Sequence, residues 1–214
     1  PWADSFVRAG YRIRLRLGSR FLRAFFRGFY PAASDAPLYN SLMPSSTPSS
    51  PSGPESPLLT GFPPGMQADA TLLIMGSFPG EASLAAGQYY AHPRNQFWRL
   101  LSAVLEDDLV QLAYPERLSR LAQHRIGLWD VIDACRREGS LDASIRNAQA
   151  ADCSVLHRDF PALITIAFNG KTSGRFAPQF EAAGFRTLVL PSSSPANAQL
   201  SFEQKLVKWR ALLS

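Results

Sequence analysis

The stretch that decides the fold is LLIMGSFPGEASLAAGQYYAHPRNQFW, residues 72–98. It begins as an apolar run, breaks at a Gly-Ser-Phe-Pro-Gly turn, and crosses a loop rich in aromatic and polar residues. A short apolar run bounded by a turn is typical of a strand buried on both faces, so we expect a strand over 71–75. From 95 to 105 apolar residues recur at helical spacing and predict a helix.

Three more apolar runs predict strands of the same kind. They cover residues 126–132, 163–168 and 186–190, and helical patterns follow at 172–183 and 201–213. Continuously apolar strands that alternate with helices form parallel sheets covered on both faces. We therefore expect an α/β fold, a three-layer sandwich in which a central, mostly parallel sheet of about four strands is flanked by helices.

The two later helices carry capping signals. Gly184 follows the helix expected over 172–183 and suits the left-handed conformation that closes many helices. Ser201 precedes the last helix, where its hydroxyl can accept from a free backbone amide. Within that helix the spacing places Glu203 and Lys205 on the polar side.

Composition excludes several classes of protein. Of the 214 residues 46% are apolar, enough for a core, but no apolar run approaches the roughly 18 residues that cross a bilayer. The two cysteines, Cys135 and Cys153, are too few for a disulfide framework, a structural zinc or an iron–sulfur cluster. We therefore expect reduced thiols, no metal, no cofactor, no membrane partner and a cytoplasmic location.

The positive charge of the chain is concentrated at its start. The net charge is +5. Residues 1–57 hold seven Arg against three acidic residues, a balance of +4, whereas residues 58–214 hold 15 Lys and Arg against 14 Asp and Glu, a balance of +1. If the folded part binds nucleic acid, it must do so through a local patch or through backbone donors.

The first 57 residues read as a leader. Residues 8–30 alternate Arg with apolar residues, and 44–57 are rich in Pro and Ser. Such a composition predicts disorder or a misjudged start site, with a targeting or membrane-surface segment as the alternative. Met66 is a plausible natural start, although residues 58–64 could still pack on the domain. We expect a functional domain over 58–214 whose activity does not need the leader.

Ligands of parallel sheets bind beyond the carboxyl ends of the strands, and three segments fall there: residues 76–95, 129–142 and 191–197. The first segment opens with the turn after the first strand, whose glycines let the backbone bend and let a ligand approach its amides. By itself this turn is a weak signal, since many α/β loops look like it. Its candidate site residues are Gly76, Ser77, Phe78, Pro79 and Gly80.

The rest of the first segment carries Tyr90, His92 and Asn95, and the second segment carries Asp130. An aromatic side chain at the sheet edge offers a flat face to a ring. The alternatives are structural: Tyr90 covers the core, His92 is an ordinary loop histidine, and Asn95 is the N-cap of the helix that follows.

The third segment follows the last strand. Its small residues and prolines form a compact turn that can press against a phosphate backbone, or else a plain strand-to-helix connection. Its residues are Ser192, Ser193, Ser194, Pro195, Ala196 and Asn197.

Together the three segments resemble the uracil-DNA glycosylase superfamily. Three sequence motifs are similar to those of its hypoxanthine-DNA (deoxyinosine) glycosylase branch: MGSFPG (75–80), QYYAHPRNQFW (88–98) and LPSSSPANA (190–198). The segments at 126–147 and 166–171 also resemble that branch, and the resemblance covers residues 58–214 in order.

The resemblance implies a monofunctional glycosylase of base-excision repair. Such an enzyme, as a monomer, extrudes a deaminated purine, hypoxanthine, from double-stranded or single-stranded DNA and hydrolyses its N-glycosidic bond to leave an abasic site. Tyr90 matches the aromatic residue that stacks on the extruded base in related mismatch-specific uracil glycosylases.

The resemblance also assigns roles, with one departure. Many superfamily members carry Asp or Asn at the third position of the turn, where this chain has Phe78. We therefore expect Asn95 to position the attacking water; its neutral amide can orient a water but cannot act as a general base. His92 would stabilise the leaving base or a phosphate, and Asp130 would accept a hydrogen bond from the base edge.

Other functions are kept as alternatives. One is a glycosylase for uracil or mismatched thymine, against which Phe78 argues. Another is a serine esterase of flavodoxin-like fold with Ser77 as nucleophile, but the three histidines are badly placed for it and Ser77 lacks the Gly-x-Ser-x-Gly elbow. A third is a non-catalytic binder of damaged DNA.

Overall fold

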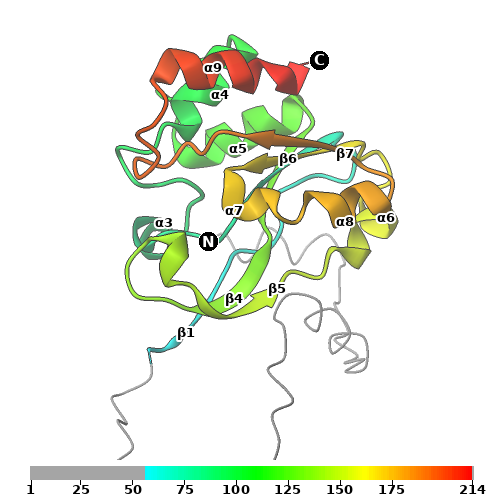
Figure 1. Ribbon diagram of the computed structural model, residues 1–214. Coiled ribbons are helices and arrows are strands. Elements are labelled where there is room, and N and C mark those ends of the chain that lie inside the picture. The colour runs from blue at the N-terminus through cyan, green and yellow to red at the C-terminus, as the bar shows by residue number, and fades with distance from the viewer. Residues whose placement is uncertain (1–55, 214) are drawn as a thin grey trace, which may run out of the picture. The chain divides into compact units, whose positions relative to one another are not determined.

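The computed structural model describes residues 56–213 (Figure 1). The predicted leader, residues 1–57, lies outside the described residues except for Ser56 and Pro57. The boundary at residue 57 therefore stays a prediction. Within 56–213 no helix has the length and apolar composition needed to cross a lipid bilayer.

The centre of the fold is a four-stranded sheet with strand order β3-β2-β6-β7. All three pairings are parallel, which confirms the α/β fold expected from the sequence. The strands are β2 (Leu72–Gly76), β3 (Ile126–Asp130), β6 (Thr165–Asn169) and β7 (Arg186–Leu190).

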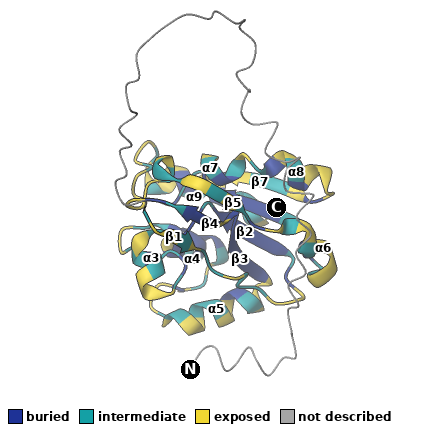
Figure 2. Cartoon of the chain, turned by 90° about the horizontal axis from the view of Figure 1, so that it is seen from below, coloured by how far each residue is buried: buried dark blue, intermediate teal, exposed yellow. Residues whose placement is uncertain are grey.

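Burial follows the place of each strand in the sheet. Every residue of β2 and β3 is buried, and Figure 2 shows both strands in dark blue at the centre of the molecule. β3 is an edge strand, but Gly65 bridges to Leu128 and covers that edge. β7, at the other edge, leaves Val189 exposed. The strands with the most continuous apolar sequence are thus the ones covered on both faces.

Three helices cover one face of the main sheet (Figure 1). Successive residues of a strand point to opposite faces. Ile74 therefore packs in one core cluster with Phe97 and Trp209, while its neighbours Leu73 and Met75 belong to a second cluster on the other face. The helices are α4 (Phe97–Leu105), α5 (Tyr114–Gln123) and α9 (Phe202–Trp209), which continues as the 3₁₀ turn η4 (Arg210–Leu213).

A second, antiparallel sheet lies on the opposite face, and the sequence did not predict it. Its order is β1-β4-β5, made of β1 (Leu58–Thr60), β4 (Ile132–Arg136) and β5 (Arg146–Ala150). Residues 126–132 were expected to form a strand that runs into a loop. The strand β3 does end at Asp130, but a second strand, β4, begins at Ile132 in place of the loop. Val131 and Ile132 donate their amides to the carbonyls of Gly76 and Ser77, and the chain leaves the main sheet there. Residues 58–60 pack on the domain by pairing with β4.

The helix expected over 172–183 is divided in two. α7 (Lys171–Gly174) and α8 (Ala177–Ala182) are separate, and Pro178 lies in the first turn of α8. Proline lacks an amide hydrogen, so it fits a first helical turn better than a helix interior. Gly184 follows α8 with φ of 93°, in the left-handed region that the sequence predicts.

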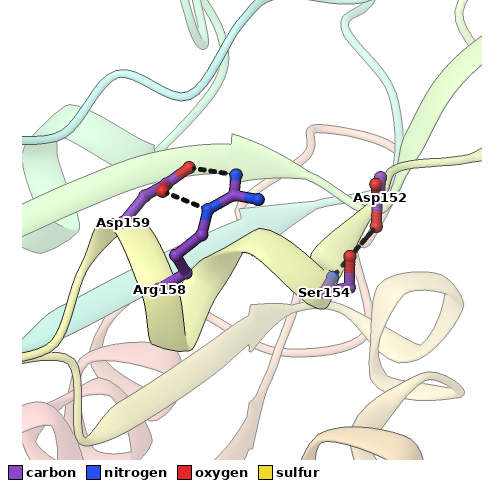
Figure 3. Close-up of polar contacts among 4 residues, drawn as sticks. All are labelled: Asp152, Ser154, Arg158 and Asp159. Carbon is purple, nitrogen blue, oxygen red and sulfur yellow. Dashed lines mark hydrogen bonds and ion pairs between the residues drawn. The ribbon is translucent and has the colours of Figure 1, made fainter. Parts of the chain in front are cut away.

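Residues 151–164 connect β5 to the main sheet and combine buried apolar residues with exposed polar contacts. Asp152 accepts a hydrogen bond from the Ser154 amide at 3.1 Å and starts the 3₁₀ turn η3 (Cys153–Val155). In α6 (Leu156–Asp159), Arg158 donates to both carboxylate oxygens of Asp159 at 2.7 and 2.9 Å (Figure 3). These contacts are exposed, so they shape the connection and add little to global stability.

Lys205 corrects the sequence reading of the last helix. Ser201 caps α9 as expected, and Glu203 is exposed, but the side chain of Lys205 is only 2% exposed. Its Nζ donates to Gln96 Oε1 at 2.9 Å and to the Asn197 carbonyl at 2.8 Å. Burial lowers the pKa of the Lys205 amine. Helical periodicity could not foresee that the inward side of α9 meets two oxygen acceptors.

Replacing Lys205 by Ala should lower the free energy of unfolding by about 1–3 kcal/mol, because two inward-facing acceptors would lose their donor. Urea denaturation measures the change. The control is Lys208→Ala, an exposed lysine of the same helix, for which we expect a change within about 0.5 kcal/mol. Equal losses in both variants would contradict the anchoring role of Lys205.

Candidate active site

The carboxyl ends of the four parallel strands meet at one edge of the main sheet. Gly76, at the end of β2, pairs with Asp130 of β3, and Asn169, at the end of β6, pairs with Leu190 of β7. The segments that follow enclose a cavity of about 930 Å³. Every site residue singled out from the sequence lines this cavity: Gly76, Ser77, Phe78, Pro79, Gly80, Tyr90, His92, Asn95, Asp130 and Ser192 to Asn197.

The turn after β2 brings two strand ends into close contact. A Cβ atom at position 76 would overlap Asp130 Oδ1 and lie 3.1 Å from the Tyr90 hydroxyl, so only glycine fits. Ser77 Oγ donates to Asp142 Oδ1 at 2.6 Å and is bonded to no histidine of the described chain, which removes the basis for a serine esterase. Phe78 is buried beside the guanidinium of Arg137. The third position of the turn therefore offers no proton-transfer group.

Asp130 is the buried carboxyl group of the cavity. Its side chain is 4% exposed, and Oδ2 has no hydrogen-bond partner within the described part of the chain. Burial, and secondly the charge of Asp142, raise the pKa of Asp130 to about 7, against the opposing effect of Arg137. A carboxyl group with this pKa changes its charge near neutral pH, and such groups concentrate at functional sites.

Tyr90 lies between the core and the cavity. Its ring stacks on Phe97 with 3.7 Å between centroids and 13° between planes. Its backbone has φ of 55°, which is unusual for a non-glycine residue and marks a constrained position. Burial raises the pKa of its hydroxyl and nearby Asn169 opposes the rise, although the hydroxyl makes no hydrogen bond of full geometry among residues 56–213. Tyr90 therefore packs on the core, as the structural alternative expects, and it also lines the cavity. Its contact with a base stays a prediction.

Asn95 has a structural contact as well as a place in the cavity. Its Oδ1 accepts from the amide of Phe97, the first residue of α4, at 3.0 Å. The N-cap of α4 is Gln96, so Asn95 lies one residue before the capping position that the sequence suggested. No hydrogen bond to a described residue engages its Nδ2. The bond to Phe97 fixes the plane of the amide, so the side chain enters the cavity in a defined orientation. His92 accepts at Nδ1 from the Arg94 amide at 3.1 Å, which leaves Nε2 as the ring's donor.

The loop after β7 is held by internal hydrogen bonds. Ser193 is fully buried, and Asn169 bonds both its amide and its hydroxyl at 2.8 Å. The Ser193 carbonyl accepts from the Gln96 amide at 3.0 Å. Trp209 donates to the Pro191 carbonyl at 3.0 Å, and Lys205 donates to that of Asn197. The loop is therefore rigid and joined to α4, β6 and α9.

The same bonds limit what this loop can donate to DNA. The amides of Ser193, Ser194, Ala196 and Asn197 all donate within the protein. The sequence suggested that backbone amides of this loop donate to DNA phosphates. Only the loop amides outside these four can do so. Two exposed cations, Arg94 and Lys171, also line the cavity. The sequence assigned neither of them a role in DNA binding; Lys171 suggested a solvated lysine at a helix start or, as a weaker alternative, a Schiff-base nucleophile.

Metal and thiol chemistry find little support within residues 56–213. No group of three or more His, Cys, Asp or Glu side chains in this range is placed to hold a metal ion. Cys135 and Cys153 are both free thiols. Burial raises the pKa of the Cys153 thiol to about 12, so this thiol is protonated and inert as a nucleophile at neutral pH.

The model of the uracil DNA glycosylase superfamily matches residues 63–213. The chain belongs to this superfamily. Two curated relatives are named hypoxanthine DNA glycosylase. The relative from Methanosarcina barkeri is 44% identical over 64% of this chain and 87% of its own length. The relative from Methanosarcina acetivorans is 40% identical over 71% of this chain and 96% of its own length.

A solved structure from the superfamily shares the fold. It is the solution NMR structure of a candidate uracil DNA glycosylase from Methanosarcina acetivorans. It is similar to this chain with a TM-score of 0.65 and 38% identity, over 73% of this chain and 99% of its own. The superfamily assignment thus agrees with the motifs at 75–80, 88–98 and 190–198, which the fold brings to one cavity.

Replacing Asp142 by Asn should lower the pKa of Asp130, because one of the two causes that raise it is a negative charge. The side-chain carbonyl of the variant could still accept from Ser77, so the turn should keep its shape. NMR titration of carboxyl carbons measures the change. Asp108→Asn, at an exposed site outside the cavity, is the control. If the pKa of Asp130 stays the same in both variants, burial alone determines it.

Proposed function

We propose that this chain is a DNA glycosylase that excises hypoxanthine, the deaminated form of adenine, and leaves an abasic site in DNA. The two curated relatives that carry this name support the substrate. The observation that carries the proposal is the buried, unpartnered carboxyl oxygen of Asp130 in the cavity, a statement that covers residues 56–213. We further propose that residues 58–214 hold the whole activity and act as a monomer, since the family model matches 63–213.

Asp130 distinguishes hypoxanthine from adenine by the hydrogen on N1. Hypoxanthine carries this hydrogen and adenine does not. An ionised Asp130 accepts it, whereas the same carboxylate faces the N1 lone pair of adenine and stays without a partner. A buried polar group left unpaired is costly, so a single such contact gives strong discrimination.

Asn95 positions the water that attacks the sugar. Cleavage builds positive charge on the sugar and negative charge on the leaving base, so the site needs an oriented water more than a strong base. The bond from Phe97 to Asn95 Oδ1 holds the amide in place, and the amide can still bond a water. His92, with Nε2 as the donor, stabilises the leaving base or an adjacent phosphate.

Tyr90 receives the extruded base on a ring that is itself supported. Extrusion costs a few kcal/mol of lost stacking, part of which a new aromatic contact recovers. Phe97 stacks on the other face of the Tyr90 ring and keeps this ring from moving when a base stacks on it. Arg94, Lys171 and the loop Ser192–Asn197 hold the DNA backbone at the mouth of the cavity.

The distribution of charge in the site agrees with a nearly neutral domain. The turn after β2 carries Phe78 and no acid or base, so the polar chemistry comes from neighbouring segments: Asn95 from the start of α4 and Asp130 from the end of β3. The cations that line the cavity are Arg94 and Lys171. Two cations can bind phosphate groups next to the cavity, but because they are few, the affinity for DNA in general is weak.

The decisive experiment uses the full chain with duplexes that carry one hypoxanthine, xanthine or uracil. The abasic product is detected by strand breakage in alkali. We expect breakage at hypoxanthine, with less at uracil because Phe78 supplies no group for uracil chemistry. Breakage at uracil alone would show that uracil, and not hypoxanthine, is the substrate. Binding of the damaged duplex without release of a base would show that the protein is a non-catalytic binder of damaged DNA.

The activity on hypoxanthine should rise with pH through about 7. Below this value Asp130, with its raised pKa, is protonated and is a weaker acceptor for the N1 hydrogen; above it the carboxylate is ionised and accepts strongly. Single-turnover rates across the neutral range measure the profile, and Asp142→Asn should move its midpoint to lower pH. If the pKa of Asp130 falls in that variant and the midpoint of the rate profile does not, Asp130 is not the group that controls the rate.

Asn95→Ala should lower the single-turnover rate at least about 100-fold, because the water loses its positioning group. Loss of the hydrogen bond to the Phe97 amide should reduce stability by only about 1 kcal/mol. Asn95→Asp, whose carboxylate can still accept from this amide, serves as the control for folding. A rate within a few-fold of wild type in Asn95→Ala would move the role to another residue.

Tyr90→Ala should weaken binding to hypoxanthine-containing DNA by about 1–3 kcal/mol, the usual range for base–aromatic stacking. Tyr90→Phe keeps the ring and should bind like wild type. Fluorescence anisotropy with a non-cleavable substrate analogue measures both affinities. Equal losses in the two variants would assign the effect to the hydroxyl group rather than to stacking.

A further inference from the structure

Arg137 is a buried cation that contacts the turn after β2. The residue follows the end of β4 and is 5% exposed. Its Cζ lies 5.0 Å from the centroid of the Phe78 ring, and Nη2 donates to the Pro79 carbonyl, shortly before α3 (Glu81–Ala86) begins. Phe78 and Pro79 line the main cavity, but Arg137 does not. It therefore supports the turn from outside the cavity and is not placed to touch a bound base.

No carboxylate is bonded to the Arg137 guanidinium in the part of the chain that the structure describes. Its Nε and Nη1 are buried and make no hydrogen bond to residues 56–213. A guanidinium stays charged at every working pH, and a buried charge is costly unless an opposite charge lies near it. The bond to Pro79 thus fixes the side chain, while its positive charge acts through space on nearby acids.

Asp130 is the acid on which this charge acts. It ends β3 beside Gly76, and the two turn residues that contact Arg137 follow Gly76 within the turn. Burial, and secondly Asp142 in the 3₁₀ turn η2 (Asp142–Ser144), raise the pKa of Asp130, and the charge of Arg137 opposes this rise. The other titratable side chains that Asp130 affects are tyrosines, whose hydroxyl pKa values burial raises, so they are uncharged at neutral pH: Tyr89, Tyr90 and Tyr114. Within 56–213, Arg137 is thus the one cation that offsets the negative charge of this site.

We propose that Arg137 is a positioning residue: it holds the turn after β2 through the Pro79 carbonyl, and its charge keeps the Asp130 carboxylate ionised. This role rests on the proposed glycosylase function, in which the ionised Asp130 accepts the N1 hydrogen of hypoxanthine. It also explains Phe78 in the turn. An Asp at this position would pair with Arg137 and offset its charge, whereas the face of a phenyl ring stabilises the cation and leaves the charge available to Asp130.

The test compares a variant that loses the charge with one that keeps it. In Arg137→Gln the pKa of Asp130 should rise by about one unit or more, because loss of a nearby cation disfavours the carboxylate. In Arg137→Lys it should stay within about half a unit of wild type. NMR titration of carboxyl carbons measures both values. Arg146→Gln is the matched control, since Arg146 is exposed and bonds only local carbonyls, and it should leave the pKa of Asp130 unchanged.

The rate of hypoxanthine release should follow the same shift. In Arg137→Gln the midpoint of the single-turnover pH profile should move up by about one unit, so that the rate near neutral pH falls about fivefold and recovers at higher pH. Arg137→Lys should keep the wild-type midpoint. A loss of rate that is equal at every pH, with the pKa of Asp130 unchanged, would show that Arg137 only maintains the shape of the turn and would overturn its electrostatic role.

A measurement on the wild-type chain keeps the test decisive if Arg137→Gln does not fold. The nitrogen resonance of Arg137 Nε should shift with pH at the midpoint of the Asp130 titration, and Asp130→Asn should remove this shift. If wild type releases no hypoxanthine, the proposed function fails, while this coupling still decides whether the two side chains interact. A resonance of Arg137 that does not respond to Asp130 would reject the electrostatic role even in an active enzyme.

Discussion

The close approach of two strand ends is the constraint on which this site depends. β2 and β3 pair in parallel up to Gly76 and Asp130, and the absence of a side chain at Gly76 leaves room for the Asp130 carboxyl group. The amides of Val131 and Ile132 then bond to the turn and direct the chain into the second sheet. That departure brings Asp142 back to Ser77. One backbone contact thus determines both the burial and the electrostatic surroundings of Asp130.

The opposite wall is rigid for a different reason. Lys205 and Trp209, both on the inward side of α9, hold the loop after β7 at its two ends. Asn169 and Gln96 hold Ser193 in its middle. A loop fixed at so many points needs little ordering when a ligand arrives, which favours binding by reducing the entropy that is lost. Rigid walls also suit chemistry that works through positioning.

The sequence by itself determined the central sheet and the membership of the cavity. Apolar runs identify buried strands, and the carboxyl ends of parallel strands must share one edge, so the residues after β2, β3 and β7 were bound to meet. The sequence did not indicate that 126–132 divides between two sheets, because hydrophobicity is the same on both sides of the division.

Only the tertiary structure decided where polar groups find partners. From the sequence, Lys205 is a surface residue. In the folded chain it donates to Gln96, which is far from it in the sequence, and to the Asn197 carbonyl. Residues 126–132 read as one strand with a loop after it until the amides of Val131 and Ile132 are seen bonded to the turn after β2. The physical reason is the same in both cases. Periodicity reports the average environment of a residue, whereas hydrogen bonds between distant segments depend on atomic positions that only the folded chain defines.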